Sequence, residues 1–187
     1  MKCFIRPDIF PHHLVDEINS LNDVLGLETN LSDSYVFDVI LNNERLEIPY
    51  RTYVNIPAED LFQNLSIRQQ QILSCFLTRH HNGFVRKQYL KRVIKIHEPW
   101  VVPFISQLIG EYVVEILFEI SKNLVYLDIK EFNKFFDDNR EFFFRTKQRV
   151  RSYWNCYYKN EYKEFEAYIG NKVITYFEGY PGRGNYT

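Results

Sequence analysis

Hydrophobic residues recur at helical spacing along most of this chain. Leu14, Ile18, Leu21 and Leu25 fall on one face of a helix, and the same pattern continues well beyond them. Together with turn and capping signals, it predicts a short helix over residues 58–65 and further helices over 11–26, 67–81, 84–96, 100–126, 128–136, 140–158 and 161–169. The helix over 100–126 is apolar on nearly all sides, so we expect it to lie at the centre of the fold.

Two stretches instead show the composition of β-strands. Residues 35–41 are rich in β-branched and aromatic side chains, and residues 46–54 partly alternate between polar and apolar. Asn42 and Asn43 lie between them and tolerate the left-handed backbone of a tight turn, which predicts a β-hairpin. Residues 173–177 have similar composition and predict a third strand.

These elements predict a mainly α protein, a single-domain helical bundle of about six to seven helices with a minor two- or three-stranded antiparallel sheet. A length of 187 residues fits one domain. Within that domain, 1–187, we distinguish an N-terminal helix and hairpin (1–56), a three-helix core unit (57–126), C-terminal helices and a strand (127–178), and a mobile tail (179–187).

The composition narrows the class of protein. Hydrophobic residues make up 45% of the chain and aromatic residues 17%, which argues against intrinsic disorder. A net charge of −1 gives no long-range field that would attract nucleic acid or an anionic membrane. The beginning of the chain is too polar for a signal peptide, and carboxylates interrupt the apolar segment 100–120. We therefore expect a cytoplasmic protein without a membrane span.

One polar cluster stands out, around the turn at Gly83. The helices over 67–81, 84–96 and 100–126 are joined by short connections, which make neighbouring helices antiparallel. Gly83 is expected to end the first of them in a left-handed conformation. One end of the three-helix unit should then collect Arg79, His80, His81, Arg86, Glu111 and Glu115. Glu111, Glu115 and Glu119 recur every four residues and should form one stripe.

The simplest interpretation of this cluster is an internal network of salt bridges, because carboxylates on an apolar helix need cationic partners. An alternative is general acid–base chemistry by His80 or His81 beside Arg79 or Arg86. Metal binding is less well supported, since side chains of consecutive helical residues diverge by about 100°. The three cysteines are far apart and form neither a disulfide framework nor a zinc motif. We predict no metal and no cofactor.

A second candidate is the predicted helix over 140–158, where basic residues precede a run of aromatic ones. Arg140, Arg145, Lys147, Arg149 and Arg151 are followed by Tyr153, Trp154, Tyr157 and Tyr158. Such a pattern can hold single-stranded nucleic acid by charge and stacking. The simpler interpretation is one solvated and one buried face, so nucleic-acid binding remains a secondary possibility.

No nucleotide-binding, P-loop or hydrolase motif occurs in the sequence. Exposed tyrosines favour protein recognition, because tyrosine is enriched at interface hot spots. The candidates are Tyr50, Tyr53, Tyr157, Tyr158 and Tyr162. The sequence thus favours a small cytosolic protein–protein interaction module of bacterial type that masks a partner protein, such as a toxin inhibitor or immunity protein. The alternative is an enzyme or nucleic-acid-acting protein that uses the cluster around Gly83.

Overall fold

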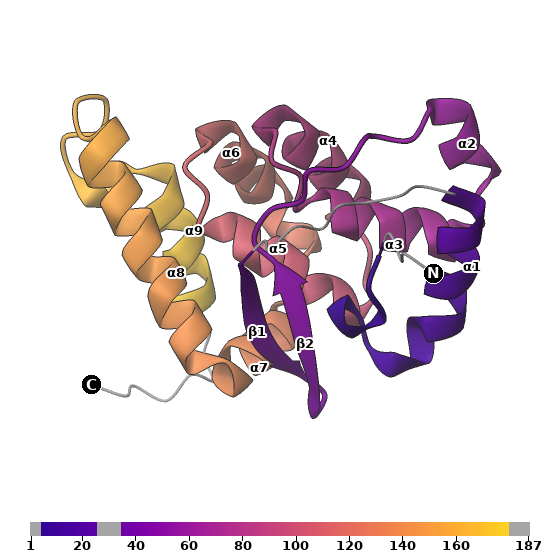
Figure 1. Ribbon diagram of the computed structural model, residues 1–187. Helices are drawn as coiled ribbons and strands as arrows, with labels where there is room; N and C mark the ends of the chain where they lie inside the picture. The colour runs from indigo at the N-terminus through magenta and orange to yellow at the C-terminus, as the bar shows by residue number, and fades with distance from the viewer. Residues whose placement is uncertain (1–4, 26–34, 180–187) are drawn as a thin grey trace. The chain divides into compact units, whose positions relative to one another are not determined.

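The computed structural model describes residues 5–25 and 35–179 (Figure 1). It is mainly helical, with 67% helix and a two-stranded antiparallel hairpin, which confirms the predicted fold class. The chain forms two compact units, Met1–Val93 and Ile94–Thr187, so the boundary falls inside the segment predicted as one three-helix unit. The single-domain organisation stays a prediction. The predicted mobile tail lies outside the described residues except for Gly179.

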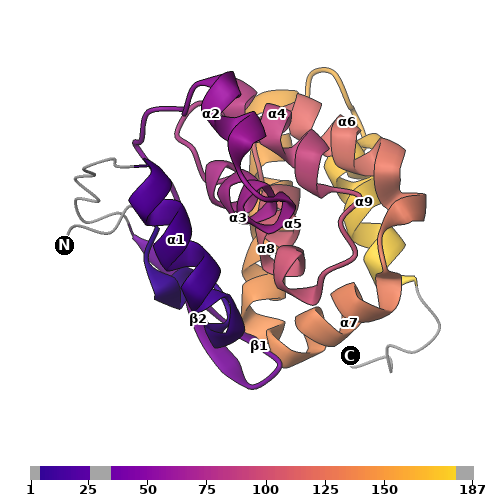
Figure 2. The same ribbon diagram turned by 90° about the vertical axis from the view of Figure 1, so that its right-hand side faces the viewer.

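The first unit combines the hairpin with four α-helices among its described residues. Its elements are the 3₁₀ turns Pro7–Ile9 and His12–Leu14, α1 (Val15–Leu25), β1 (Val36–Leu41), β2 (Glu44–Pro49), α2 (Glu59–Asn64), α3 (Ile67–Leu77) and α4 (Gly83–Val93). Within this unit α1 and α4 both pack against α3, and the turn at Pro7–Ile9 packs against β2 (Figure 2).

The hairpin follows its sequence closely. Phe37, Val39 and Leu41 are buried while the residues between them are exposed, as the alternating pattern requires. Asn42 and Asn43 have φ angles of 50° and 68°, the left-handed values that a two-residue hairpin turn needs. The predicted hairpin is therefore confirmed, but its second strand is shorter than predicted: β2 ends at Pro49, and residues 50–54 lie outside the strand.

The turn between α3 and α4 differs from the prediction. Ser66 caps the start of α3 in a reciprocal capping box with Gln69. However, α3 ends at Leu77, and Gly83 is the first residue of α4 instead of a left-handed cap. Asn82 takes the N-cap position, because its side-chain oxygen accepts a hydrogen bond from the Phe84 amide at 2.9 Å.

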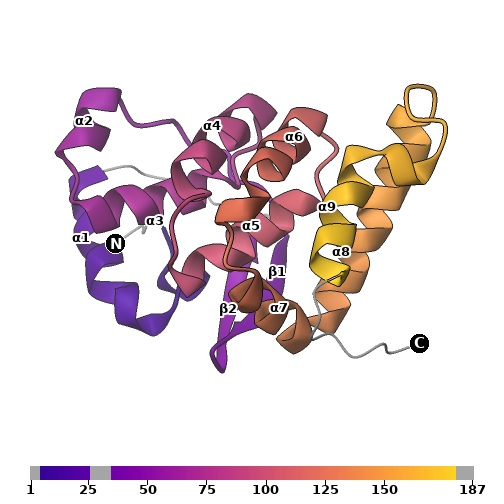
Figure 3. The same ribbon diagram turned by 180° about the vertical axis from the view of Figure 1, so that it is seen from behind.

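The second unit is entirely helical in its described part (Figure 3). Its elements are the 3₁₀ turn Pro99–Val101, α5 (Val102–Ile109), α6 (Val114–Asn123), the 3₁₀ turn Leu124–Tyr126, α7 (Ile129–Asp138), α8 (Arg140–Tyr153), a π-helical turn Trp154–Tyr158, the 3₁₀ turn Phe165–Ala167 and α9 (Ile169–Glu178). Every residue of α5 is buried, and α6, α7, α8 and α9 all pack against it. None of the helices in the described ranges combines the length and hydrophobicity that a membrane span requires.

The predicted long helix over 100–126 is wrong, because the chain breaks between α5 and α6. Gly110 ends α5 at a point where the Arg149 side chain lies so close that a Cβ on residue 110 would be 2.7 Å from its Nε. Glu111 lies in the break and not on a helix, so the predicted stripe through Glu111, Glu115 and Glu119 does not form. Only Glu115 and Glu119 share a helix, α6.

The predicted strand over 173–177 is also wrong, since these residues belong to α9. Val173, Ile174 and Phe177 are buried and share one helical face, whereas Thr175 and Tyr176 are exposed. The predicted helix over 161–169 is wrong as well, because only the 3₁₀ turn Phe165–Ala167 forms there before α9 begins at Ile169. Gly170 lies in the first turn of α9, where an added Cβ would meet Val150 at 2.8 Å. This close packing of α9 on α8 outweighs the strand propensity of Val173-Ile174-Thr175.

Candidate protein-binding surface

Four tyrosines gather where α8 passes into the π-helical turn. We call Tyr112, Tyr153, Tyr157 and Tyr158 the tyrosine surface. Tyr112 lies in the break before α6, and its ring centroid is 5.9 Å from that of Tyr153 and 6.4 Å from that of Tyr157. Tyr157 is 65% exposed and Tyr112 46% exposed, so two large aromatic side chains face solvent beside each other. Neighbouring exposed aromatic rings make this surface a candidate for an interaction site.

Hydrogen bonds and ring stacking fix the position of the tyrosine surface. The Tyr158 hydroxyl donates a hydrogen bond of 2.6 Å to the Tyr112 carbonyl, which ties the π-helical turn to the start of α6. The Tyr158 ring stacks on the buried ring of Tyr168 at 5.4 Å. The Trp154 indole donates to the Tyr162 carbonyl at 2.9 Å and so anchors the loop that follows. These contacts restrain the backbone that carries the exposed rings. Such restraint would lower the entropy lost when a partner binds.

Two carboxylates lie near the Tyr158 hydroxyl at the edge of the tyrosine surface. Burial raises the pKa of the Tyr158 hydroxyl, and the nearby carboxylates of Glu115 and Glu161 raise it further. The hydroxyl thus stays protonated and can donate its hydrogen bond at neutral pH. Glu115 and Glu161 are themselves exposed, so they place negative charge at the rim.

The structure brings together part of the predicted binding set. Tyr157 and Tyr158 lie in the tyrosine surface, and Tyr162 packs edge-on against Tyr168 at 5.5 Å behind it. Tyr50 and Tyr53 belong to the first unit, where Tyr50 is half-buried against Phe37 and Tyr53 is 69% exposed.

Tyr112 was missed, and Tyr153 was predicted only as part of a nucleic-acid-binding helix. The spacing of Tyr153 and Tyr157, four residues apart, places them on one helical face. That spacing was the available signal for Tyr153. No local signal marks Tyr112, which comes from a different element.

The residues predicted around Gly83 lie in both units. Arg79, His80, His81 and Arg86 belong to the first unit, and Glu111 and Glu115 to the second. The predicted contact between the four residues of the first unit and the two glutamates of the second stays a prediction. In the part of the chain that the structure describes, no group of three or more metal-ligating side chains comes together.

Arg79 and Arg86 bind backbone oxygens within the first unit. The Arg79 guanidinium is fully buried and donates to the carbonyls of Pro49 and Tyr50, at 3.3 and 3.1 Å. Arg86 on α4 is fully buried too, and its Nη1 donates to the carbonyls of His80 and His81, at 2.9 and 2.8 Å. Arg79 thus satisfies carbonyls at the end of β2 and directly after it, and Arg86 satisfies carbonyls in the turn after α3.

Both ring nitrogens of His80 are occupied. The Asn82 amide donates to Nδ1 at 3.1 Å, so Nδ1 carries no proton. Nε2 therefore carries the proton and donates it to the Val54 carbonyl at 3.0 Å. His80 is held as the neutral tautomer by the backbone, which favours a structural role for this residue over general acid–base chemistry. His81 is exposed and stacks on Tyr53, with ring centroids 5.0 Å apart.

The state of His80 leads to an expected pH dependence. Burial lowers the pKa of His80, with smaller contributions from His81 and Arg86. Below about pH 6.5 the unfolded chain takes up a proton at this position more readily than the folded chain does. We therefore expect the free energy of unfolding to be greatest above pH 6.5 and to fall as the pH drops toward the lower folded-state value.

Urea unfolding at pH 7.5 and 5.5 would measure this effect. The difference between the two pH values should shrink in His80→Gln and persist in His81→Gln, which removes an exposed imidazole from the neighbouring position. Equal pH dependence of the wild type and His80→Gln would contradict the assignment.

The basic residues of α8 are mostly engaged within the second unit. Arg145 pairs with Glu141 at 2.6 Å, and Lys147 with Glu178 at 2.9 Å. Arg149 donates to Gln107 at 3.0 Å and to Thr146 at 2.9 Å. A nucleic-acid backbone requires several available cations, so these contacts weaken the nucleic-acid interpretation of this helix.

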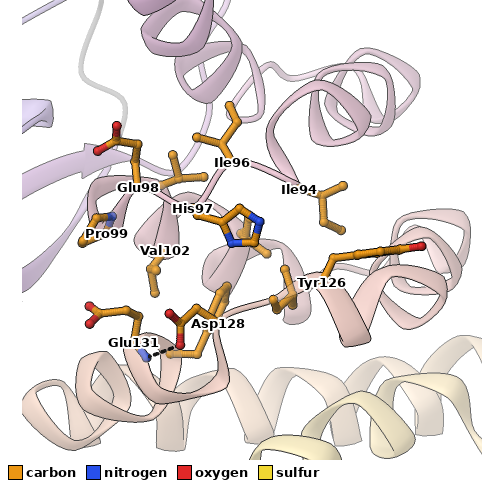
Figure 4. A pocket seen from close by; sticks show the side chains of 13 residues that line it. Ile94, Ile96, His97, Glu98, Pro99, Val102, Tyr126, Asp128 and Glu131 are labelled. Atoms are coloured by element: carbon orange, nitrogen blue, oxygen red, sulfur yellow. Dashed lines mark hydrogen bonds between the residues drawn. The ribbon is translucent and has the colours of Figure 1, made fainter.

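A small pocket lies between the connection Ile94–Pro99 and α7 (Figure 4). Its floor is apolar, and His97, Tyr126, Asp128 and Glu131 surround it. Its cavity volume is about 20 Å³, which holds a single water molecule. The Asp128 carboxylate is used as the N-cap of α7, where it accepts from the amides of Lys130 and Glu131. This pocket is too small to be a ligand site.

Comparisons of the chain with protein-family models, with curated proteins and with solved structures found no match.

Proposed function

We propose that this chain is a small cytoplasmic protein–protein interaction module that binds its partner through the tyrosine surface. The observation that carries the proposal is the side-by-side exposure of Tyr112 and Tyr157 on a base fixed by Tyr158 and Tyr168. Tyrosines of this kind offer large contact area at low entropic cost and dominate many protein interfaces.

The two carboxylates beside Tyr158 indicate the chemistry of the partner. Glu115 and Glu161 lie near Tyr158 and are exposed, so a partner surface with lysine or arginine side chains would be complementary. Such cations could also lie over the faces of the exposed tyrosine rings. A partner with a basic functional surface would be masked by this contact, which is the inhibitor or immunity role that the sequence suggested.

The first step of the test is to purify the tagged chain from the cells in which it occurs naturally and to identify the proteins that co-purify with it. A single stoichiometric protein is expected, and its dissociation constant is then measured with both purified components by calorimetry. Tyr157→Ala should weaken binding about 30-fold, the effect of losing one hot spot of about 2 kcal/mol. If the partner has an activity, one equivalent of the wild-type chain should suppress it.

Phe144→Ala is the matched control. Phe144 is 55% exposed on α8, the helix that leads into the π-helical turn of Tyr157, and lies outside the tyrosine surface. Its removal should therefore leave affinity unchanged. Exchange of Glu115 for lysine should weaken binding most at low salt, because rim charges act through long-range attraction. Unchanged affinity in Tyr157→Ala, or co-purification of nucleic acid or metal in place of a protein, would overturn the proposal.

A further inference from the structure

A groove runs between α8 and α9 in the second unit. Its cavity volume is about 230 Å³, more than ten times that of the pocket beside His97. The buried side chains of Val150 and Ile174 contribute apolar surface, and Gln148 and Asn171 add amide groups. This volume is below that of typical cofactor sites but is large enough to receive side chains of a bound peptide.

Two cations line the groove, and their situations differ. Lys147 is neutralised by Glu178 at 2.9 Å. Arg151, one turn further along α8, is exposed and lies over the Phe165 ring at 4.6 Å. Among residues 5–25 and 35–179, no carboxylate forms an ion pair with Arg151. The groove therefore presents one guanidinium that is oriented by an aromatic ring and available to an anion.

We propose that this groove binds an acidic peptide segment of a partner protein, with a carboxylate on Arg151 and an adjacent apolar side chain over Val150 and Ile174. A guanidinium matches a carboxylate through two parallel hydrogen bonds. The contact with the Phe165 ring restrains the Arg151 side chain before binding, which reduces the entropy lost. The Lys147–Glu178 pair leaves a single anchoring charge, which suits one carboxylate better than the repeated phosphates of a nucleic acid.

This site is separate from the tyrosine surface and does not rest on the proposed function. Arg151 and Tyr153 are two residues apart on α8, so their side chains point about 200° apart around the helix. An acidic segment in the groove and a basic partner at the tyrosine surface would therefore occupy different sides of α8.

The test is an NMR titration of the ¹⁵N-labelled full-length chain with a blocked peptide of alternating leucine and glutamate. The Arg151 Nε–H signal and the amide signals of α8 and α9 around the groove should shift and saturate. A matched peptide of leucine and glutamine should bind at least tenfold more weakly. Arg151→Gln should weaken binding of the acidic peptide at least tenfold, whereas Arg145→Gln, which removes a cation already paired on the same helix, should not.

Three results would overturn the proposal. These are no saturable shift with the acidic peptide, equal binding of the two peptides, or stronger shifts of the same signals by an eight-residue oligothymidylate. Tyr157→Ala should bind the acidic peptide as the wild type does. The two tests are therefore independent. If the tyrosine surface binds no partner, binding of the acidic peptide in the groove is still expected, and if the groove binds no peptide, partner binding at the tyrosine surface is still expected.

Discussion

Replacing Arg79 with alanine is expected to lower the free energy of unfolding by about 3 kcal/mol. The guanidinium is fully buried, donates to the carbonyls of Pro49 and Tyr50, and lies 5.9 Å from the centre of the Phe37 ring. Alanine would leave a cavity and remove the hydrogen-bond donor of a carbonyl at the end of β2. The urea midpoint followed by circular dichroism should fall by roughly 1.5 M. Amide exchange in β1 and β2 should accelerate, because Arg79 holds the chain that leaves the hairpin.

Arg45→Ala is the control for this experiment. Arg45 also belongs to the first unit, but its side chain is 62% exposed and pairs with Asp38 on the surface. Pairs of this kind contribute less than about 1 kcal/mol. An unchanged midpoint in Arg79→Ala would contradict the structural role of Arg79. It would instead favour the alternative in which the residues around Gly83 carry out catalysis or contact nucleic acid.

The sequence predicts the fold best where local and tertiary preferences agree. The hairpin combines strict alternation in β1 with two asparagines that accept a left-handed turn, so no distant contact is needed to define it. The start of α3 is equally local, because Ser66 and Gln69 cap each other across four residues.

The errors arise where packing overrides local preference. Nothing near Gly110 shows that Arg149, 39 positions later, occupies the space next to it, yet this contact accompanies the break between α5 and α6. The break removed Glu111 from the stripe on which the predicted cluster depended. Similarly, Val173 and Ile174 favour a strand by composition but form a helix because Gly170 allows α9 to approach Val150.

The candidate site was predictable only in part for the same reason. Tyr157 and Tyr158 could be named from composition, and Tyr153 is related to Tyr157 by helical spacing. Tyr112 joins them from an element 41 residues before Tyr153, through the hydrogen bond from Tyr158 to its carbonyl. A single sequence contains no spacing rule that reveals a contact of that kind. The orientation of Arg151 on Phe165 likewise depends on a loop whose path becomes visible only in the structure.

Phe136→Ala is expected to have the second large effect, a loss of about 3 to 5 kcal/mol in the free energy of unfolding. Phe136 on α7 is fully buried, stacks on Phe143 of α8 at 4.1 Å and meets Phe177 of α9 edge-on at 5.4 Å. It thus joins three helices of the second unit, and the cavity left by alanine would have rings on several sides.

Tryptophan fluorescence is the appropriate measurement, since both tryptophans, Trp100 and Trp154, belong to the second unit. The urea midpoint should fall steeply in Phe136→Ala and only moderately in Phe136→Leu, which keeps much of the volume. Phe144→Ala should stay within about 0.5 kcal/mol of the wild type, because exposed positions tolerate substitution. Similar losses in Phe136→Ala and Phe144→Ala would mean that the contacts of Phe136 with Phe143 and Phe177 do not form the core of this unit.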